Sequence, residues 1–493
     1  MTAEICQVIT EPYSTVYKEI TDMSASSPTA LLRRAMPLAI VLALAACASV
    51  PDLGPLPQPK SLGVSPNAGQ VQLDASWWQH YGDAQLNQLI DEALRNAPDL
   101  AAADARVRKA IGAAQQAGAA TLPSVGVNAS LSRMKQSYNN GVPAAFVPQG
   151  LNNSVRATLD LSYEIDFWGK NRSALAAATN EQAAAEADAA QARLTLSTAI
   201  AAAYAELAHL YAQRDAAQQA LEIRTQSAQL IKERQQQGLE TLGTVRQADS
   251  RSASAKAELL AIEESIALQG HQLAALMGAE PERGDRIQRP AINLAQNITI
   301  PAQLHADLLG RRPDLTAARL RAEAAAKRID QSRAEFYPNL NLSAYVGAQS
   351  LGLGLFTKAG SGIAGFGPAI SLPIFRGGQL QGQYRVTRAQ YDEAVANYDQ
   401  TLNRALQDVA DALSSQAALD GRLSAQQESL AAAEDALRIA RNRYQGGLAT
   451  YLDVLTAEDS VVASRRSLSD LQTRRLSLDV ALIRALGGGY RAA

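Results

Sequence analysis

The feature that most constrains the fold of this chain is an internal duplication of its sequence. Three pairs of landmarks recur in the same order in the two halves: Asn96-Ala-Pro-Asp-Leu100 and Arg312-Pro-Asp-Leu315, Gly238-Leu239 and Gly447-Leu448, Leu276-Met-Gly278 and Ala485-Leu-Gly487. In both halves the same interval separates the proline of the first landmark from a second proline, Pro123 or Pro338. An internal repeat means that one structural plan is built twice, so the fold must accommodate both copies.

Each copy is predicted to form a helix, a strand, a loop, a second strand and then two long helices. Pro98 and Pro313 each precede an aspartate, which is a favourable helix opening and needs no chemical role. From Asn171 to about Gln237 the chain is rich in Ala, Gln, Glu, Arg and Leu, with almost no Gly or Pro. At 1.5 Å per residue this segment predicts a single helix of roughly 100 Å. Its apolar residues recur at three- and four-residue steps, so one face is expected to be buried.

The clearest strand pattern runs from Val155 to Phe167, where odd positions are apolar and even positions are polar. Such strict alternation is long for a soluble strand and suits a tilted strand in a membrane, although a half-buried soluble strand gives the same pattern. Its counterpart in the second copy, 368–375, is weaker because Pro368 and Pro373 cannot donate ladder hydrogen bonds. Segments 122–131 and 337–346 supply the other two expected strands.

Four strands are too few to close a barrel, since the smallest membrane barrels have about eight. Strands in lipid must nevertheless close, because an unpaired edge leaves polar groups unsatisfied. Several chains must therefore contribute to one barrel, and the strand count leaves their number open. The predicted fold class is a mixed α/β membrane protein with a duplicated helix-strand-strand-helix-helix plan.

The N-terminal region predicts export and lipid attachment. Arg33 and Arg34 precede a short apolar run that ends in Leu44-Ala45-Ala46, a layout typical of a secretory signal. Cys47 follows directly, so the site resembles a bacterial lipobox whose cysteine receives a diacylglycerol and an N-acyl chain; the alternative is an ordinary signal peptide with an incidental cysteine. Ala48 and Ser49 follow without an Asp, which by the same resemblance implies sorting to the outer membrane.

Further features of the sequence limit the structures and partners expected for the rest of the chain. Cys6 lies upstream of this signal, and Met23 is a more natural start of the chain. The mature chain would then contain Cys47 as its single cysteine, so no internal disulfide is expected. Five prolines mark 47–70 as an extended linker behind the lipid. The formal net charge of −2 gives no basic face, so nucleic acid is not an expected partner. Beyond residue 46 no apolar stretch is long enough for a transmembrane helix.

The mature chain resembles the TolC-like outer membrane efflux proteins, specifically the lipoprotein branch that serves RND-type pumps. The resemblance extends from Trp77-Trp78 to Tyr490, and three segments carry most of it: Arg312-Pro-Asp-Leu-Thr-Ala-Ala-Arg-Leu-Arg-Ala-Glu323, Phe336-Tyr-Pro-Asn-Leu-Asn-Leu-Ser343 and Tyr444-Gln-Gly-Gly-Leu-Ala-Thr-Tyr-Leu-Asp-Val-Leu455. It implies a homotrimer with a twelve-stranded β-barrel continued by a long α-helical barrel. It also implies two protein partners, a periplasmic membrane-fusion adaptor and an inner-membrane RND-type transporter.

The resemblance assigns the turns of the two long helix hairpins to a periplasmic tip that contacts the adaptor and forms the resting gate. The candidate adaptor contacts are Gly238, Leu239, Thr241, Gly447, Leu448 and Thr450. The candidate gate residues are Asp453, which would form an acidic ring around a symmetry axis, and Thr456. Family members often carry Asp where this chain has Thr456, so the ring is expected to hold less charge. Two simpler roles compete: Asp453 complements the helix start, and the leucines pack back on the last turn.

No motif of the chain predicts catalysis, a cofactor or a metal. Gly360-Ser-Gly-Ile-Ala-Gly365 matches a dinucleotide fingerprint, but it leads into a strand and not a helix, so a flexible extracellular loop is expected there. His80, His209, His271 and His305 lack metal-ligand spacing and are expected to be surface or packing residues. The covalent lipid on Cys47 is the only expected non-protein group.

The sequence therefore predicts a passive outer membrane channel of a tripartite efflux pump, lipid-anchored and extending into the periplasm, which conducts drugs or other small toxic compounds. The alternatives are a lipid-tethered periplasmic coiled-coil scaffold without a pore and a duct for type I protein secretion. The expected organisation is a signal region at 1–46, the linker at 47–70, one repeat at 71–285 with strands near 122–133 and 154–167, and a second at 286–493 with strands near 338–347 and 366–375.

Overall fold

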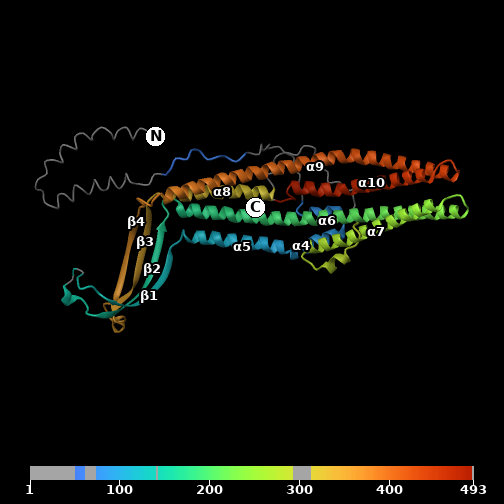
Figure 1. Cartoon of the computed structure of the whole chain (residues 1–493). Coiled ribbons are helices and arrows are strands. Elements are labelled where there is room, and N and C mark those ends of the chain that lie inside the picture. The colour runs from blue at the N-terminus through green and yellow to red at the C-terminus, as the bar shows by residue number, and fades with distance from the viewer. Residues whose placement is uncertain (1–49, 61–73, 140, 142, 292–311, 491–493) are drawn as a thin grey trace, which may run out of the picture. The chain divides into compact units, whose positions relative to one another are not determined.

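The computed structural model describes residues 50–60, 74–139, 141, 143–291 and 312–490 (Figure 1). Cys6, Met23 and Cys47 lie outside these described residues. The elements follow in this order: η1 (Trp77–Tyr81), α4 (Ala84–Asn96), α5 (Pro98–Ala119), β1 (Ser124–Lys135), η2 (Ala144–Phe146), β2 (Leu151–Ile165), α6 (Lys170–Gln236), α7 (Leu242–Leu276), η3 (Pro281–Arg286), α8 (Pro313–Ala334), β3 (Asn339–Leu351), η5 (Leu353–Leu355), β4 (Gly362–Ser371), α9 (Gln379–Gln445) and α10 (Tyr451–Ala485).

The duplicated plan of the sequence is confirmed element by element. The first copy is α5, β1, β2, α6 and α7, and the second is α8, β3, β4, α9 and α10. The long helices match in length, since α6 and α9 each have 67 residues while α7 and α10 each have 35. At 1.5 Å per residue, α6 and α9 are each about 100 Å long. The bounds of α6 agree with the helix predicted from its composition.

The chain forms two compact units, and each unit draws on both repeats. The described residues of 1–54, 120–171 and 329–387 form what we call the strand unit, which contains all four strands. The helix unit contains the described residues of 55–119, 172–328 and 388–493. The duplication is thus intertwined, because each repeat supplies two strands to one unit and long helices to the other.

The strand unit contains one antiparallel sheet in the order β1-β2-β3-β4. Its register aligns the apolar residues of neighbouring strands, as in the pairs Val127–Leu159 and Leu159–Val346. One face of the sheet is therefore apolar, and its residues include Val125, Val127, Leu131, Leu159, Val346, Phe366 and Ile370, all largely exposed in the isolated chain. The opposite face is polar and carries Arg156, Asp160 and Glu164 of β2. The alternation predicted for β2 thus produces a sheet with two chemically distinct faces.

The strand bounds correct two expectations. Residues 366–375 were expected as the last strand, but β4 covers Gly362–Ser371 and stops before Pro373, which could not donate a ladder hydrogen bond. Of the glycine-rich stretch 360–365, which was expected as a flexible loop, residues 362–365 form the first part of β4 instead and pair with β3. A Cβ on Gly365 would lie 2.7 Å from the ring of Tyr345, so a larger residue at this position would force that ring to move.

An aromatic group lies beside the end of β2 that leads into α6. The indole of Trp168 stacks on the ring of Tyr337 with a centroid separation of 4.6 Å, and its Nε1 donates to the carbonyl of Pro338 at 2.9 Å. Phe167 packs edge-on against Trp168 at 4.9 Å and is itself exposed. An indole with an apolar body and a satisfied N–H is the chemistry expected at a membrane interface.

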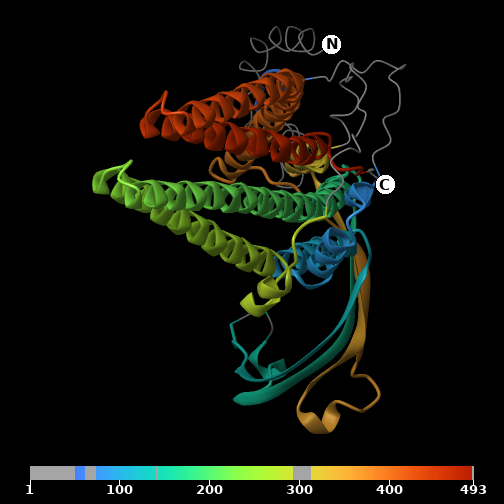
Figure 2. The same ribbon diagram turned by 90° about the vertical axis from the view of Figure 1, so that its right-hand side faces the viewer.

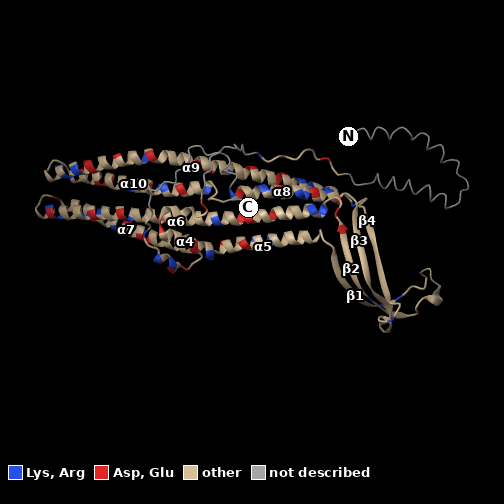
Figure 3. Ribbon diagram, turned by 180° about the vertical axis from the view of Figure 1, so that it is seen from behind, with Lys and Arg blue, Asp and Glu red and all other residues tan. Residues whose placement is uncertain are grey.

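The helix unit consists mainly of two helical hairpins, α6–α7 and α9–α10, which lie side by side (Figure 2). Charged residues are distributed along all four of these helices (Figure 3). Frequent alanines, such as Ala184, Ala187 and Ala317 in one buried cluster, let neighbouring helices approach closely. Within the described part of the chain, no helix combines the length and the apolarity needed to cross a membrane.

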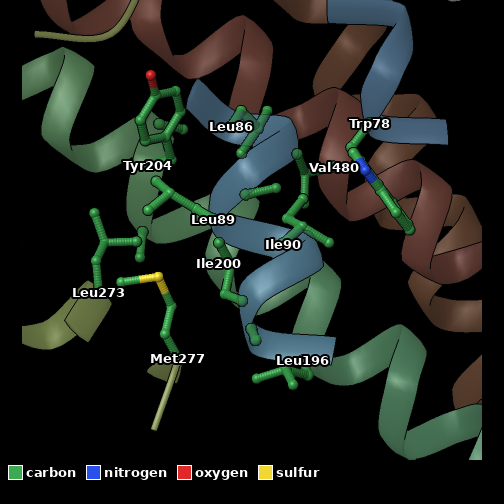
Figure 4. Packing of buried hydrophobic residues seen from close by; sticks show 14 of the residues in the cluster. Trp78, Leu86, Leu89, Ile90, Leu196, Ile200, Tyr204, Leu273, Met277 and Val480 are labelled. Atoms are coloured by element: carbon green, nitrogen blue, oxygen red, sulfur yellow. The ribbon is translucent and has the colours of Figure 1, made fainter. Parts of the chain in front are cut away.

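The largest apolar core of the helix unit forms where α4 packs onto α6 (Figure 4). Asp83 caps α4 by accepting from the backbone N–H groups of Gln85 and Leu86 at 2.8 and 3.2 Å. It also accepts from the hydroxyl of the buried Tyr204 on α6 at 2.8 Å. The amphipathic face of α4 is buried against α6, α7 and α10, through Leu86, Leu89, Ile90 and Ala93. Each large apolar side chain buried there contributes about 1.5–3 kcal/mol.

The start of α8 does more than open a helix. Pro313 is the first residue of α8, as the sequence predicted. The preceding Arg312 is buried; it bonds Asp314 at 2.8 Å and Asp408 of α9 at 3.0 Å, and donates to the carbonyl of Ala485 at the end of α10 at 3.2 Å. This single guanidinium therefore connects three helices of the second repeat.

The described part of the proline-rich linker lies along α9. The hydroxyl of Tyr391 donates to the carbonyl of Pro57 at 2.9 Å, and the backbone N–H of Lys60 donates to Asp399 at 3.0 Å. Prolines keep this segment extended and leave its carbonyls free to accept such bonds. Residues 57–60 are thus held against a helix and do not form a free tether.

Candidate gate and docking site at the hairpin tips

The turn between α6 and α7, which we call the first tip, ends one helix and starts the next within a few residues. Gly238 has a φ of +75°, a left-handed conformation that favours glycine, and the N–H of Leu239 bonds back to the carbonyl of Arg234 at 2.9 Å. Thr241 then caps α7 by accepting from the N–H of Thr244 at 3.2 Å. Leu239 and Leu242 both remain largely exposed.

The turn between α9 and α10, the second tip, repeats this geometry. Gly447 also has a φ of +75°, and the N–H of Leu448 bonds to the carbonyl of Arg443 at 2.7 Å. The helix end is thus closed by backbone hydrogen bonds, while the side chain of Leu448 is 73% exposed and Leu452 is 62% exposed. Exposed leucines on a tip whose backbone is already satisfied leave an apolar surface available for another molecule.

The predicted gate residues share the first two turns of α10. The backbone N–H and the hydroxyl of Thr450 both donate to Oδ2 of Asp453 at 2.8 Å, so Asp453 completes the start of the helix. These two hydrogen bonds lower the pKa of Asp453, and its carboxylate is therefore ionised at neutral pH. Thr456 lies three residues later on the same exposed face, whereas Val454 and Leu455 between them are buried. The helix-start role and an outward-facing carboxylate thus coexist at Asp453.

Two acidic residues just beyond this turn join the two hairpins, and the sequence did not reveal them. Glu458 on α10 is buried; it accepts from the hydroxyl of Ser227 on α6 at 2.7 Å and pairs with Arg441 on α9 at 3.0 Å. Its neighbour Asp459 pairs with Arg224 on α6 at 3.2 Å and with Arg251 on α7 at 2.7 Å. We call Glu458, Asp459 and their partners the tip network.

Tyr444 adds a further connection between the tips. Its hydroxyl donates to Glu240 of the first tip at 2.6 Å, and the guanidinium of Arg234 lies 4.6 Å from its ring centroid. Burial, reinforced by the nearby Glu240, raises the pKa of Tyr444, so the hydroxyl keeps its proton and remains a donor. An apolar cluster beneath these contacts includes Ile231, Val245, Leu437, Tyr451 and Val454. The hairpins are therefore held together by both packing and polar contacts.

The structure places the predicted tip and gate residues on the two tips and at the start of α10. Thr450, Asp453 and Thr456 form one surface at the start of α10, while Gly238, Leu239 and Thr241 lie on the first tip and Gly447 and Leu448 on the second. The predicted lipid site, Cys47, lies outside the described residues. Among the residues described, no group of three or more His, Cys, Asp or Glu side chains is arranged to hold a metal ion. His209 instead packs between helices, with Nδ1 2.9 Å from the hydroxyl of Thr473.

A four-stranded sheet with one apolar face, connected to two helical hairpins of about 100 Å and built from a duplicated chain, defines the TolC-like class of outer membrane channels. The sequence profile described as "Outer membrane efflux protein" matches residues 89–279 and 304–488. The chain belongs to this family of outer membrane efflux channels, which extend into the periplasm and are not known as enzymes.

Individual relatives and solved structures agree with this assignment. The outer membrane protein VceC of Vibrio cholerae is 49% identical, with a TM-score of 0.81 over 85% of this chain and all of that structure. The fusaric acid resistance protein FusA of Burkholderia cepacia is 37% identical over 71% of this chain and 68% of its own length. The cation efflux system protein CusC of Escherichia coli K12 is 30% identical over 92% of this chain and 99% of its own length.

Proposed function

We propose that three copies of this chain pool their strands into a twelve-stranded β-barrel, continued by an α-helical barrel, and form the outer membrane channel of a tripartite efflux pump. The observation that carries this proposal is a sheet whose apolar face is exposed and whose outer strands, β1 and β4, have no further strand beside them among the described residues. In lipid such edges must be paired, and only closure with other chains can pair them. The repeats 71–285 and 286–493 then contribute two strands each.

The proposed cargo is drugs or other small toxic compounds, moved from the periplasm to the exterior. Relatives named for fusaric acid resistance, multidrug resistance and cation efflux support this class of cargo without fixing one compound. The channel itself is passive, and the energy comes from an inner-membrane RND-type transporter coupled through a periplasmic adaptor.

The hairpin tips are the proposed contact with the adaptor and the proposed gate. Around a threefold axis, three copies of Asp453 would form a ring of ionised carboxylates, with Thr456 adding hydroxyls one turn further on. Acidic rings attract cations at a constriction. The exposed Leu239 and Leu448 supply the apolar surface on which the adaptor docks.

Reconstitution tests the channel directly. The purified protein is expected to migrate as a heat-modifiable trimer and to give stepwise currents in planar lipid bilayers. A lipid-tethered scaffold without a pore would remain non-conducting under the same conditions. That result would overturn the proposal.

Charged substitutions at both tips test the docking surface. In cells, the double variant Leu239→Asp and Leu448→Asp is expected to reduce cross-linking to the adaptor at least roughly tenfold, since each carboxylate would be desolvated against an apolar partner surface. Leu353→Asp is the matched control, because Leu353 is equally exposed but lies in the loop between β3 and β4. Equal capture of the adaptor by the tip variant and the control would contradict the assignment.

Lipid attachment is proposed at Cys47. Cells fed labelled palmitate are expected to label the wild-type chain, and Cys47→Ala is expected to abolish the label because no other cysteine follows in the chain. Undiminished labelling of the Cys47→Ala variant would contradict this site.

A further inference from the structure

The charges of the sheet are distributed unevenly along its strands. Residues 124–159 and 340–371 contain four basic residues, Arg133, Lys135, Arg156 and Lys358, and no Asp or Glu. The acidic residues of β2, Asp160 and Glu164, lie nearer the end that leads into α6. Figure 3 shows the strands otherwise almost free of charged residues. All the charged residues in the half of the sheet nearest the β1–β2 and β3–β4 loops are therefore basic.

The register separates these basic residues between the two faces. Arg133 pairs with Asn153 and Lys135 with Leu151, in phase with Leu131–Val155 and Val127–Leu159, so both cations lie on the apolar face. Arg156 lies on the polar face, where its guanidinium is 5.3 Å from the ring centroid of Tyr345. Cations on the lipid-facing side of a strand are tolerated near the membrane interface, where anionic groups can meet them.

Neither cation forms an ion pair with another described residue of the chain. Among the described residues Arg133 makes no ion pair, and the ammonium of Lys135 lies 5.4 Å from the ring centroid of Tyr138. At a β-strand rise of about 3.4 Å per residue, residues two apart on the same face are separated by about 7 Å. That spacing lets two cations contact neighbouring phosphate groups of one lipid.

We propose that Arg133 and Lys135 bind the phosphate groups of lipopolysaccharide in the outer leaflet of the outer membrane. This inference rests on the proposed barrel, because the helices then lie in the periplasm and the β1–β2 loop faces the exterior. Leu131, exposed on the same face two residues before Arg133 and farther from the loop, lies where the acyl chains of that lipid begin. The arginine offers a planar fork and the lysine a point charge, both suited to phosphate.

The test measures lipid A retained by the intact assembly extracted from outer membranes, using native mass spectrometry. The double variant Arg133→Gln and Lys135→Gln is expected to retain lipid A roughly ten- to thirtyfold more weakly, because each basic residue near an anionic surface contributes about a factor of five. Enzymatically dephosphorylated lipid A is expected to bind the wild type as weakly as lipid A binds the double variant. If the dephosphorylated lipid binds the wild type as tightly as lipid A, the inference is wrong.

Arg156→Gln is the matched control, since it removes a cation of the same strand pair from the polar face. A loss of lipid A in this variant equal to that of the double variant would also overturn the inference. Should the double variant fail to assemble, Lys135→Gln alone is expected to show about a fivefold loss. Bilayer conductance of the wild type separates the failure of the lipid site from the failure of the channel. If the wild type conducts and the variants bind lipid A as tightly as the wild type, only the proposed lipid site is wrong. If the wild type does not conduct, the proposed channel is wrong.

Discussion

Replacing Asp459 by alanine is expected to raise the conductance of the resting channel up to about thirtyfold. Asp459 pairs with Arg224 of α6 and Arg251 of α7, so the substitution removes two ion pairs between the hairpins at once. Partly exposed pairs of this kind are each worth about 0.2–1 kcal/mol. If the tips open by separation of the two hairpins, losing both pairs shifts the closed-to-open equilibrium by up to about thirtyfold. Single-channel recording in planar bilayers measures this directly.

The control variant removes an aspartate whose ion pair lies within a single helix and does not connect the two hairpins. Asp435 pairs with Arg438 within α9 at 3.0 Å, and both side chains are well exposed, so Asp435→Ala is expected to leave the conductance unchanged. Tyr444→Phe offers an independent test, because it deletes only the hydroxyl that reaches Glu240 and should shift conductance in the same direction as Asp459→Ala. Unchanged conductance in both tip variants would show that the tip network does not hold the resting state.

The helices and the duplicated plan could be predicted from the sequence because their signals are local. The α6 segment has almost no Gly or Pro over its whole length, and Pro98 and Pro313 mark the starts of α5 and α8. The strict alternation in β2 likewise shows which of its residues share one face of the sheet, and it does so whichever strands pair with β2. These features depend on neighbours within a few residues, and they place the tip turns correctly at Gly238 and Gly447.

The features of the fold and of the tips that could not be predicted from the sequence depend on tertiary contacts. The first half of β4 is glycine-rich and has no alternation to read, and it becomes a strand through its pairing with β3. The partners of Glu458 and Asp459 on α6 and α7 lie 208 to 235 residues away, so no spacing rule could match them. For Asp453 the sequence left two roles open, because an aspartate fits both a helix start and an acidic ring. In the structure its carboxylate accepts hydrogen bonds from Thr450 at the helix start and remains exposed.

Proline substitutions in β1 are expected to abolish the trimer, and they test barrel closure more sharply than any other change. Successive backbone N–H groups of a strand point to opposite edges of that strand. Of the N–H groups of Val127 and Asn128, one therefore points toward β2 and the other points toward the side of β1 that has no neighbouring strand. Proline removes the N–H, which an edge strand tolerates on its free side but a paired strand does not. In lipid each group left unsatisfied costs several kcal/mol, and the loss recurs in every copy of the chain.

Val127→Pro and Asn128→Pro should therefore both eliminate the heat-modifiable trimer from purified outer membranes, because a closed barrel has no free edge. Val127→Thr and Asn128→Thr keep the N–H at the same positions and should assemble normally. If one of the two proline variants still forms trimers while the other does not, β1 is an unpaired edge in the assembly. The strands would then not close into a shared barrel, and the means by which this chain crosses the outer membrane would have to be sought elsewhere.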